Sequence, residues 1–376
     1  MFKMIIGSDI VPTEGNIGLF KEGNAREIVG DKLLKVLKEA DFTVFNLETP
    51  LCDVENPILK CGPNLIAPSE TVKGIKEIGT SLLALANNHI LDQDVDGLYK
   101  TFEMLNEHKI PYIGAGKNLD EARKPYVIDA DGKKIGIYNC AEHEFTIAEE
   151  DKAGANPFDA LESPDHIAAL KEVCDFVVVL YHGGKEYYPY PSPNLQKICR
   201  KIVEKGADLV VCQHSHCVGC EEKYLGGTIV YGQGNFIFAK NFDIECWQIS
   251  ILVEAEFSDD LKINYIPITI HEKGTRLAES EKAREIMDGF YSRSEEIKDK
   301  KFLIESFKKV AVSSEEMYLF SLAGRESNLK ITQDKFIPCY DETALLRMTN
   351  YLLCEPHKEC VDSIVKQRLE KILEGR

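Results

Sequence analysis

The chain has 376 residues, enough for one large domain and a smaller one, and 44% of them are hydrophobic, as in an ordinary globular protein. Its formal net charge is −17. A charge of this sign repels the phosphates of nucleic acids and of anionic membranes, so we expect neither as a partner.

The first half of the chain alternates between strand and helix patterns. Buried-strand patterns at 3–10, 41–50 and 80–89 are separated by segments with apolar residues at helical spacing, at 31–40 and 68–79. A further helix is predicted over 96–110. Strands that alternate with helices indicate an α/β domain.

The middle of the chain adds hairpins to this alternation. Asp131 and Gly132 lie between two β-type runs, as in a tight hairpin, and the segment 247–272 is typical of strand, turn and strand. Further strands are predicted at 174–182, 207–213 and 227–238, and a helix at 192–206. Hairpins inside an α/β alternation favour an α/β fold with two stacked mixed β-sheets flanked by helices.

The last hundred residues have a different pattern. From about residue 273 the apolar residues recur at helical spacing, in 277–310 and again in 360–376. We therefore expect a first domain at 1–272 and a helical C-terminal region at 273–376.

The N-terminal residues and the cysteines bear on the compartment. The start "MFKMIIGSDIVP" lacks the pattern of a signal peptide, and the sequence contains no apolar run of the length that spans a membrane. Twelve cysteines are scattered through the chain, several inside apolar runs. We expect reduced, mostly buried thiols and a cytoplasmic protein.

Polar side chains follow five of the predicted strands at the point where each strand ends. Carboxylates, amides and imidazoles in such positions meet at one sheet edge when the strands lie side by side, and together they suit first-row divalent metals. A lone histidine more often packs or hydrogen-bonds than binds metal, but five strand ends together favour a site. These residues are Asp9, Asn46, Glu48, Asn87, Asn88, His89, His182, His214 and His216.

The stretch "VVCQHSHCVGCE" concentrates the strongest ligand types. In an extended segment the rings of His214 and His216 leave from the same face, whereas on a helix they would diverge by about 200°. Cys217 and Cys220 form a CxxC, but no second CxxC completes a four-thiolate zinc site. We interpret these two cysteines as small residues that line a turn.

Six blocks, in order, resemble the poly-γ-glutamate capsule-synthesis (CapA) family, a branch of the calcineurin-like metallophosphoesterases. They are "GSDIV", "FNLETPL", "ANNHILD", "LYHGGKEYY", "QHSH" and "YGQGNFIF", and they run from residue 4 to about 240. The resemblance implies the two-sheet metallophosphoesterase-like α/β/β/α sandwich and a binuclear centre of divalent ions such as Mn, Fe or Zn.

The resemblance also implies roles for individual residues. Asp9 and His216 would hold the first metal, Glu48 would bridge, and Asn88, His182 and His214 would hold the second. His89 would donate a proton to the leaving oxygen or stabilise charge on the substrate, oriented by Asp92. Further contacts would come from Asn46 and from Glu186, which lies close to His182 in the sequence.

The match departs from the superfamily pattern at one position. The superfamily usually shows Asp-x-His in its first block, and here the third position is Val11. The first metal would therefore lack one ligand. We expect Lys185 and Tyr187 to line the mouth of the metal site, where they could contact the substrate. Further candidates for this position are Tyr188, Tyr190, Arg200 and the stretch 142–144. A packed Pro/Tyr-rich loop is the alternative for the tyrosines.

Three functions agree with these residues. The first is a metal-dependent hydrolase that cleaves a phosphoester or an amide of a γ-linked glutamate polymer or another cell-surface polymer, with an anionic small molecule or polymer as substrate. The second is a non-catalytic assembly or binding protein of capsule production that keeps the fold. His89 favours the first and Val11 the second. A nucleotidase-like enzyme is a third option, without a nucleotide-specific signal.

Overall fold

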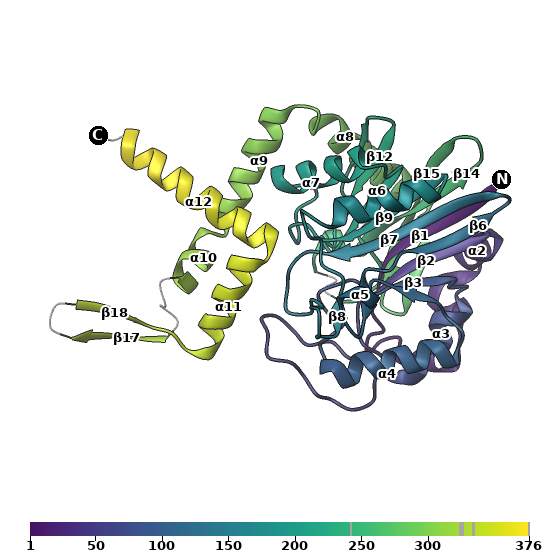
Figure 1. Cartoon of the computed structure of the whole chain (residues 1–376), viewed down its shortest axis with the longest axis horizontal. Helices are drawn as coiled ribbons and strands as arrows, with labels where there is room; N and C mark the ends of the chain where they lie inside the picture. The colour runs from purple at the N-terminus through teal and green to yellow at the C-terminus, as the bar shows by residue number, and fades with distance from the viewer. Residues whose placement is uncertain (241–242, 323–326, 333–334, 375–376) are drawn as a thin grey trace.

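Two β-sheets form the centre of the molecule (Figure 1). The structure is a computed structural model, and it describes residues 1–240, 243–322, 327–332 and 335–374. Both large sheets lie within the first 277 residues and mix parallel with antiparallel strands. The predicted class, α/β with two stacked mixed sheets flanked by helices, is confirmed.

The first sheet has the strand order β16-β15-β14-β1-β2-β3-β4, with β13 beside β1. Its strands β1, β2 and β3 are parallel, so their carboxyl ends lie at one edge. The strands are β1 (Phe2–Ile10), β2 (Phe42–Leu47), β3 (Leu82–Ala84), β4 (Tyr112–Ile113), β13 (Asn235–Ile237), β14 (Ile249–Phe257), β15 (Leu261–His271) and β16 (Gly274–Leu277).

The second sheet has the order β11-β12-β10-β9-β7-β6, and its four central strands are parallel. The predicted hairpin joins β6 to β7, and Asp131 and Gly132 at its tip both have positive φ, as a tight hairpin turn requires. The strands are β6 (Tyr126–Ala130), β7 (Lys133–Ala141), β9 (Phe176–His182), β10 (Leu209–Gln213), β11 (Glu221–Tyr224) and β12 (Gly227–Tyr231). A small ladder pairs β5 (Ala115–Gly116) with β8 (Gly154–Ala155).

Helices cover the outer faces of both sheets. Those of the first 277 residues are α1 (Ile17–Glu22), α2 (Ala25–Glu39), α3 (Val72–Glu77), α4 (Asp94–Glu107), α5 (Leu119–Ala122), α6 (Ser163–Val173) and α7 (Pro193–Glu204), with 3-10 turns at Ser69–Thr71 and Glu245–Gln248. As the sequence predicts, α7 begins at Ser192, whose side chain accepts a hydrogen bond from the Leu195 N–H.

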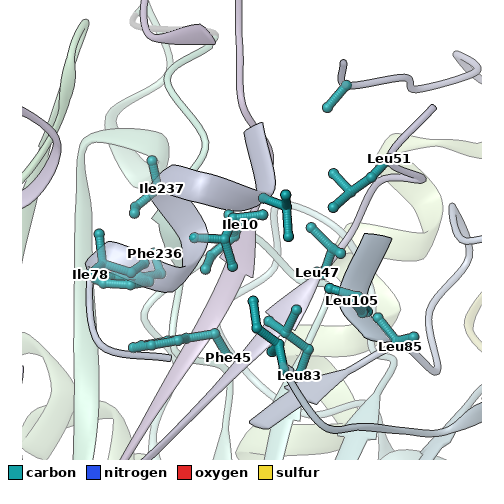
Figure 2. Packing of buried hydrophobic residues seen from close by; sticks show 14 of the residues in the cluster. Ile10, Phe45, Leu47, Leu51, Ile78, Leu83, Leu85, Leu105, Phe236 and Ile237 are labelled. Atoms are coloured by element: carbon teal, nitrogen blue, oxygen red, sulfur yellow. The ribbon is translucent and has the colours of Figure 1, made fainter. Parts of the chain in front are cut away.

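Three apolar layers hold the sandwich together. Alternate residues of β1 face opposite ways: Ile5 packs under α2, α3 and α4, while Met4 and Ile6 pack between the sheets. Figure 2 shows the layer under these helices, where the rings of Phe45 and Phe236 stack with centroids 4.6 Å apart. A third layer lies between the second sheet and α6 and α7. This packing fixes the strand ends in register.

The C-terminal region is mostly helical, as predicted, and lies to one side of the sheets in Figure 1. Its helices are α8 (Ser280–Glu296), α9 (Lys300–Ser313), α10 (Glu315–Leu322), α11 (Glu342–Leu353) and α12 (Glu355–Glu374). It also contains a hairpin that the sequence patterns do not predict, β17 (Ser327–Thr332) with β18 (Lys335–Cys339). The boundary after residue 272 stays a prediction, and β16 extends the first sheet to Leu277.

Among the residues that the structure describes, none of the helices combines the length and the apolar character that crossing a membrane requires.

Candidate metal centre

The polar residues predicted at the strand ends come together at one edge of the sandwich. They lie at or just after the carboxyl ends of β1, β2 and β3 of the first sheet and of β9 and β10 of the second. The expectation that one sheet edge carries all of them is therefore wrong, because two sheets supply them. All of the predicted ligands are at least nine-tenths buried: Asp9, Glu48, Asn88, His182, His214 and His216. We call these six residues the candidate metal centre.

Asp9, Glu48 and His216 form the first of two overlapping groups. Their ligand-type atoms all lie within 4.8 Å of one another. Asp9 Oδ2 is 3.7 Å from Nδ1 of His216. Two carboxylates and an imidazole are a ligand set that first-row divalent metals accept.

Glu48, His182 and His214 form the second group, again within 4.8 Å. Nε2 of His182 faces two oxygens, at 3.2 Å from Glu48 Oε1 and 3.0 Å from the amide oxygen of Asn88. The rings of His182 and His214 have centroids 4.9 Å apart. Because Glu48 belongs to both groups, it occupies the position of a bridging ligand.

Several buried polar atoms of these groups lack a hydrogen-bond partner among the described residues. They are both carboxylate oxygens of Glu48, Oδ2 of Asp9 and Nδ1 of His214. A buried carboxylate oxygen without a partner costs free energy, and a bound cation removes that cost. The residues present therefore fit divalent metal ions.

The pKa values follow from burial. Burial lowers the pKa of His182 to about 4 and that of His214 well below its usual value, so both imidazoles are neutral near pH 7, the form that binds metal. Burial, and then the charge of Glu48, raise the pKa of Asp9 to about 6. At His216 burial lowers the pKa, but the nearby carboxylates outweigh it and the net shift is upward.

A second layer of amides orients the ligands. Asn46, predicted as an additional contact, donates from Nδ2 to Asp9 Oδ1 at 2.7 Å and lies 3.3 Å from Nδ1 of His182. Asn235 places its amide oxygen 2.8 Å from Nδ1 of His216. An acceptor at Nδ1 favours the tautomer whose Nε2 is free for a metal.

The loop that carries His214 and His216 is bent, and the expectation of an extended segment is wrong. Both residues have positive φ, 86° and 54°. Their rings nevertheless stay close, with centroids 6.0 Å apart. The bend continues to Gly219, where any side chain would overlap the carbonyl group of Tyr231, so the sequence needs glycine there.

His89 and Asp92 lie beside the centre and contact each other as predicted. Nδ1 of His89 is 2.5 Å from Asp92 Oδ2. A third residue, which the sequence patterns do not single out, completes this group: Lys60 forms an ion pair with Asp92 and lies 3.1 Å from Nδ1 of His89. The Lys60 side chain is only 2% exposed. It comes from an irregular loop, where no periodicity could reveal it.

Val11 lies next to the first group and is buried in an apolar cluster with Phe238 and Trp247. The Trp247 ring also contacts that of His216 at a tilt of 35°, with centroids 4.5 Å apart. The position at which the resemblance implies a histidine ligand is therefore occupied by a buried valine.

The loop after β9 divides into two parts. Tyr187 is half-exposed and its ring lies 6.2 Å from that of His216, at the edge of the centre. Tyr188 and Tyr190 instead donate hydrogen bonds to Ser306 and Glu296 of the C-terminal helices, which is the packed-loop alternative.

The charged residues near this loop also have different surroundings. Burial acts to lower the pKa of His182 and of His216, and the negative charge of Glu186 acts in the opposite direction on both. Lys185 lies near α12, where burial and then the charge of Lys185 lower the pKa of His357 to about 4. Arg200, a candidate anion contact, forms an ion pair with Glu222 on β11.

The stretch after β7 is deeper than expected for a rim. Glu142 is 2% exposed, accepts a hydrogen bond from the Gly184 N–H at 2.9 Å and lies 3.4 Å from Nε2 of His214. Burial raises the pKa of Glu144 to about 7. These two carboxylates and His214 also lie within 4.8 Å of one another.

Residues 4–240 match the family model of the bacterial capsule synthesis protein PGA_cap. The capsule biosynthesis protein CapA of Bacillus anthracis is 30% identical over 247 residues, which cover 63% of this chain and 60% of that protein. The PGA biosynthesis protein CapA of Bacillus subtilis (strain 168) is 26% identical over 245 residues, with 63% of each chain covered. The matched segments thus span less than two thirds of these curated relatives.

Two solved structures are similar at low identity. One is a phosphatase of Mycoplasma pneumoniae, with 17% identity and a TM-score of 0.44, covering 71% of this chain and 93% of that chain. The other is a 5'-nucleotidase precursor of Thermus thermophilus, with 14% identity and a TM-score of 0.42, covering 77% of this chain and 58% of that chain.

Proposed function

Because the chain belongs to the bacterial capsule synthesis protein (PGA_cap) family, we propose that it is a metal-dependent hydrolase linked to the biosynthesis of a capsule polymer. Its substrate would be an anionic phosphoester or a γ-glutamyl amide. The observation that carries the proposal is Glu48, a fully buried carboxylate that is shared by two ligand groups and has no hydrogen-bond partner among the described residues on either oxygen.

The metals would be held by the six residues of the candidate metal centre, with Glu48 between the two positions. Divalent ions there would supply an activated water at neutral pH and a positive charge for the substrate oxygen. That local charge also reconciles an anionic substrate with a chain of net charge −17.

His89 would serve as the proton donor to the leaving oxygen. The carboxylate of Asp92 accepts a hydrogen bond from Nδ1–H of His89, and the ion pair with Lys60 holds that carboxylate in place. In the doubly protonated form that acts as the donor, Nδ1–H would stay on Asp92 and Nε2–H would give its proton to the leaving oxygen, which leaves neutral His89. The His89 residue is 9% exposed, at the edge of the otherwise buried centre.

The second candidate is a non-catalytic assembly protein that retains the fold, and Val11 favours it. A hydrocarbon in place of a ligand weakens the first metal position. A protein that needs only the shape of the domain tolerates this change better than an enzyme does.

The test combines metal analysis with turnover. We expect His214→Ala to contain about two first-row metal ions per chain fewer than the wild type when both are purified without chelator. Hydrolysis of p-nitrophenyl phosphate, bis-p-nitrophenyl phosphate and γ-glutamyl-p-nitroanilide is then compared between the wild type and His89→Ala, which keeps its metals.

The outcomes separate the candidates. Turnover that requires His89 supports the hydrolase, and we expect a loss of about 100-fold or more in this variant. Bound metal without turnover of either substrate class favours the assembly protein. If Mn²⁺ and Zn²⁺ are offered and neither binds, the metal-dependent mechanism is wrong.

A further inference from the structure

A second set of metal-ligand side chains lies where the C-terminal helices meet the sheet domain. Glu144 comes from the loop after β7, Cys354 joins α11 to α12, and His357 lies in the first turn of α12. Their ligand-type atoms all lie within 4.8 Å of one another. We call these three residues the C-terminal cluster.

The surroundings of Cys354 are polar. Its Sγ lies 3.7 Å from Oε1 of Glu142 and 3.7 Å from Oε1 of Glu144, although the residue is 1% exposed. A buried cysteine that acts as a small hydrophobe has apolar neighbours. Cys360, on α12, differs from Cys354: it packs in a cluster with Tyr188 and Phe307, and its thiol contacts the hydroxyl of Tyr318.

The imidazole of His357 is held in one orientation. The hydroxyl of the fully buried Tyr318 lies 2.7 Å from Nδ1, and this contact leaves Nε2 for a metal. A ligating histidine usually has its other nitrogen fixed in this way. Thiolate, imidazole and carboxylate together are the donor types that Zn²⁺ prefers.

The interface around the cluster is tied down independently. Glu355, between Cys354 and His357, accepts a hydrogen bond from the His143 N–H at 2.9 Å and lies 2.7 Å from its ring nitrogen Nδ1. These two contacts fix the loop after β7 against the start of α12. A cleft of about 580 Å³, lined in part by Glu144, Asn350 and Leu353, leads to this side of the cluster and offers a path for an ion.

We propose that Glu144, Cys354 and His357 form a further divalent-metal site of the zinc type, with Glu142 as a candidate fourth ligand, which fastens α11 and α12 to the sheet domain. Glu142 and Glu144 also lie within 4.8 Å of His214, so the site adjoins the candidate metal centre. The segment that supplies two of its ligands lies outside residues 4–240, which match the family. This proposal does not depend on the hydrolase function.

The test loads metal-free full-length protein with Co²⁺ and records the near-ultraviolet absorption. The predicted ligands of the candidate metal centre include no cysteine, so a thiolate-to-cobalt charge-transfer band reports the C-terminal cluster. We expect the band in the wild type, its loss in Cys354→Ser, and its retention in the matched control Cys360→Ser. His214→Ala should keep the band while losing cobalt from the centre.

Zinc analysis provides the second readout. Cys354→Ser and His357→Gln should each contain about one metal ion fewer than the wild type, with the thermal unfolding of the metal-free proteins unchanged within a few degrees. Because His357→Gln keeps every cysteine, it covers the case in which Cys354→Ser does not fold. A band that survives Cys354→Ser, or cobalt that binds without any band, overturns the proposal.

Discussion

At the scale of single residues, the feature that stands out is charge buried without matching partners. Glu48 and Asp9 are fully buried, and their two carboxylates lie close enough that burial and then the charge of Glu48 raise the pKa of Asp9. Such an arrangement destabilises a protein unless something else compensates. Its presence at the junction of five strands is the physical reason to place metal ions there.

Lys60 gives the first prediction at this scale. Its ammonium group is buried against Asp92, so Lys60→Met leaves that carboxylate with fewer partners and should lower the free energy of unfolding by about 3 kcal/mol. Urea denaturation measures the loss. Turnover should fall together with stability, since His89 loses its ordered partner, while the metal content should stay unchanged.

The control is a lysine in an exposed pair. Lys100 contacts Glu103 at 3.0 Å on the surface of α4, with side chains 36% and 54% exposed. Lys100→Met should leave the free energy of unfolding nearly unchanged, because solvent screens this exposed pair. Equal losses in the two variants would contradict the role assigned to Lys60.

At the scale of elements, the loop with His214 and His216 depends on a helix far away in the sequence. Arg293 of α8 donates from Nε to Gly219 O at 2.8 Å and from Nη2 to Val218 O at 2.9 Å. Strand β10 positions one end of the loop, and α8 holds the other. The C-terminal region thus supports the candidate metal centre without supplying a ligand to it.

We therefore expect Arg293→Met to weaken metal binding although it removes no ligand. Two carbonyl groups lose their donors, which should reduce the free energy of unfolding by about 2 kcal/mol. Metal affinity, measured by competition with a chelator, should drop by about 10-fold or more, as for other residues that orient ligands. Arg284→Met, at an exposed position of the same helix, should leave both quantities unchanged.

At the scale of the whole molecule, the centre joins the two sheets at their common edge. Asp9, Glu48 and Asn88 come from the first sheet, and His182, His214 and His216 from the second. Ions bound between them would link both layers of the sandwich. Metal binding should therefore be coupled to global stability.

Metal removal should lower the melting temperature of the entire domain. A ligand that binds only the folded state at about 100 times its Kd contributes about 2.7 kcal/mol, so chelation should remove stability of that order. Differential scanning calorimetry with and without EDTA measures the effect. In His214→Ala the shift should be much smaller, and an equal shift would place the stabilising metal elsewhere, for example in the C-terminal cluster.

The sequence by itself determined the sheet domain and the members of the candidate metal centre. Alternating apolar runs specify which residues are buried, and parallel strands bring their carboxyl ends to one edge, so the sequence could group Asp9 with Glu48 and His182 with His214. It could not show that the two pairs belong to different sheets and meet across the sandwich. These inferences rest on local periodicity, which the sequence contains directly.

Only the tertiary structure decided which residues surround that centre. Lys60 lies in an irregular loop. Arg293 lies on a helix more than 70 residues from the loop at 214–220, and Cys354 and His357 lie even farther along the chain from Glu144. The amphipathic patterns of these helices do not say which sheet edge they meet. The positive φ of His214 and His216 likewise arises from how the loop is held at both ends. Contacts between distant segments depend on how the layers pack, and no short stretch of sequence encodes that packing.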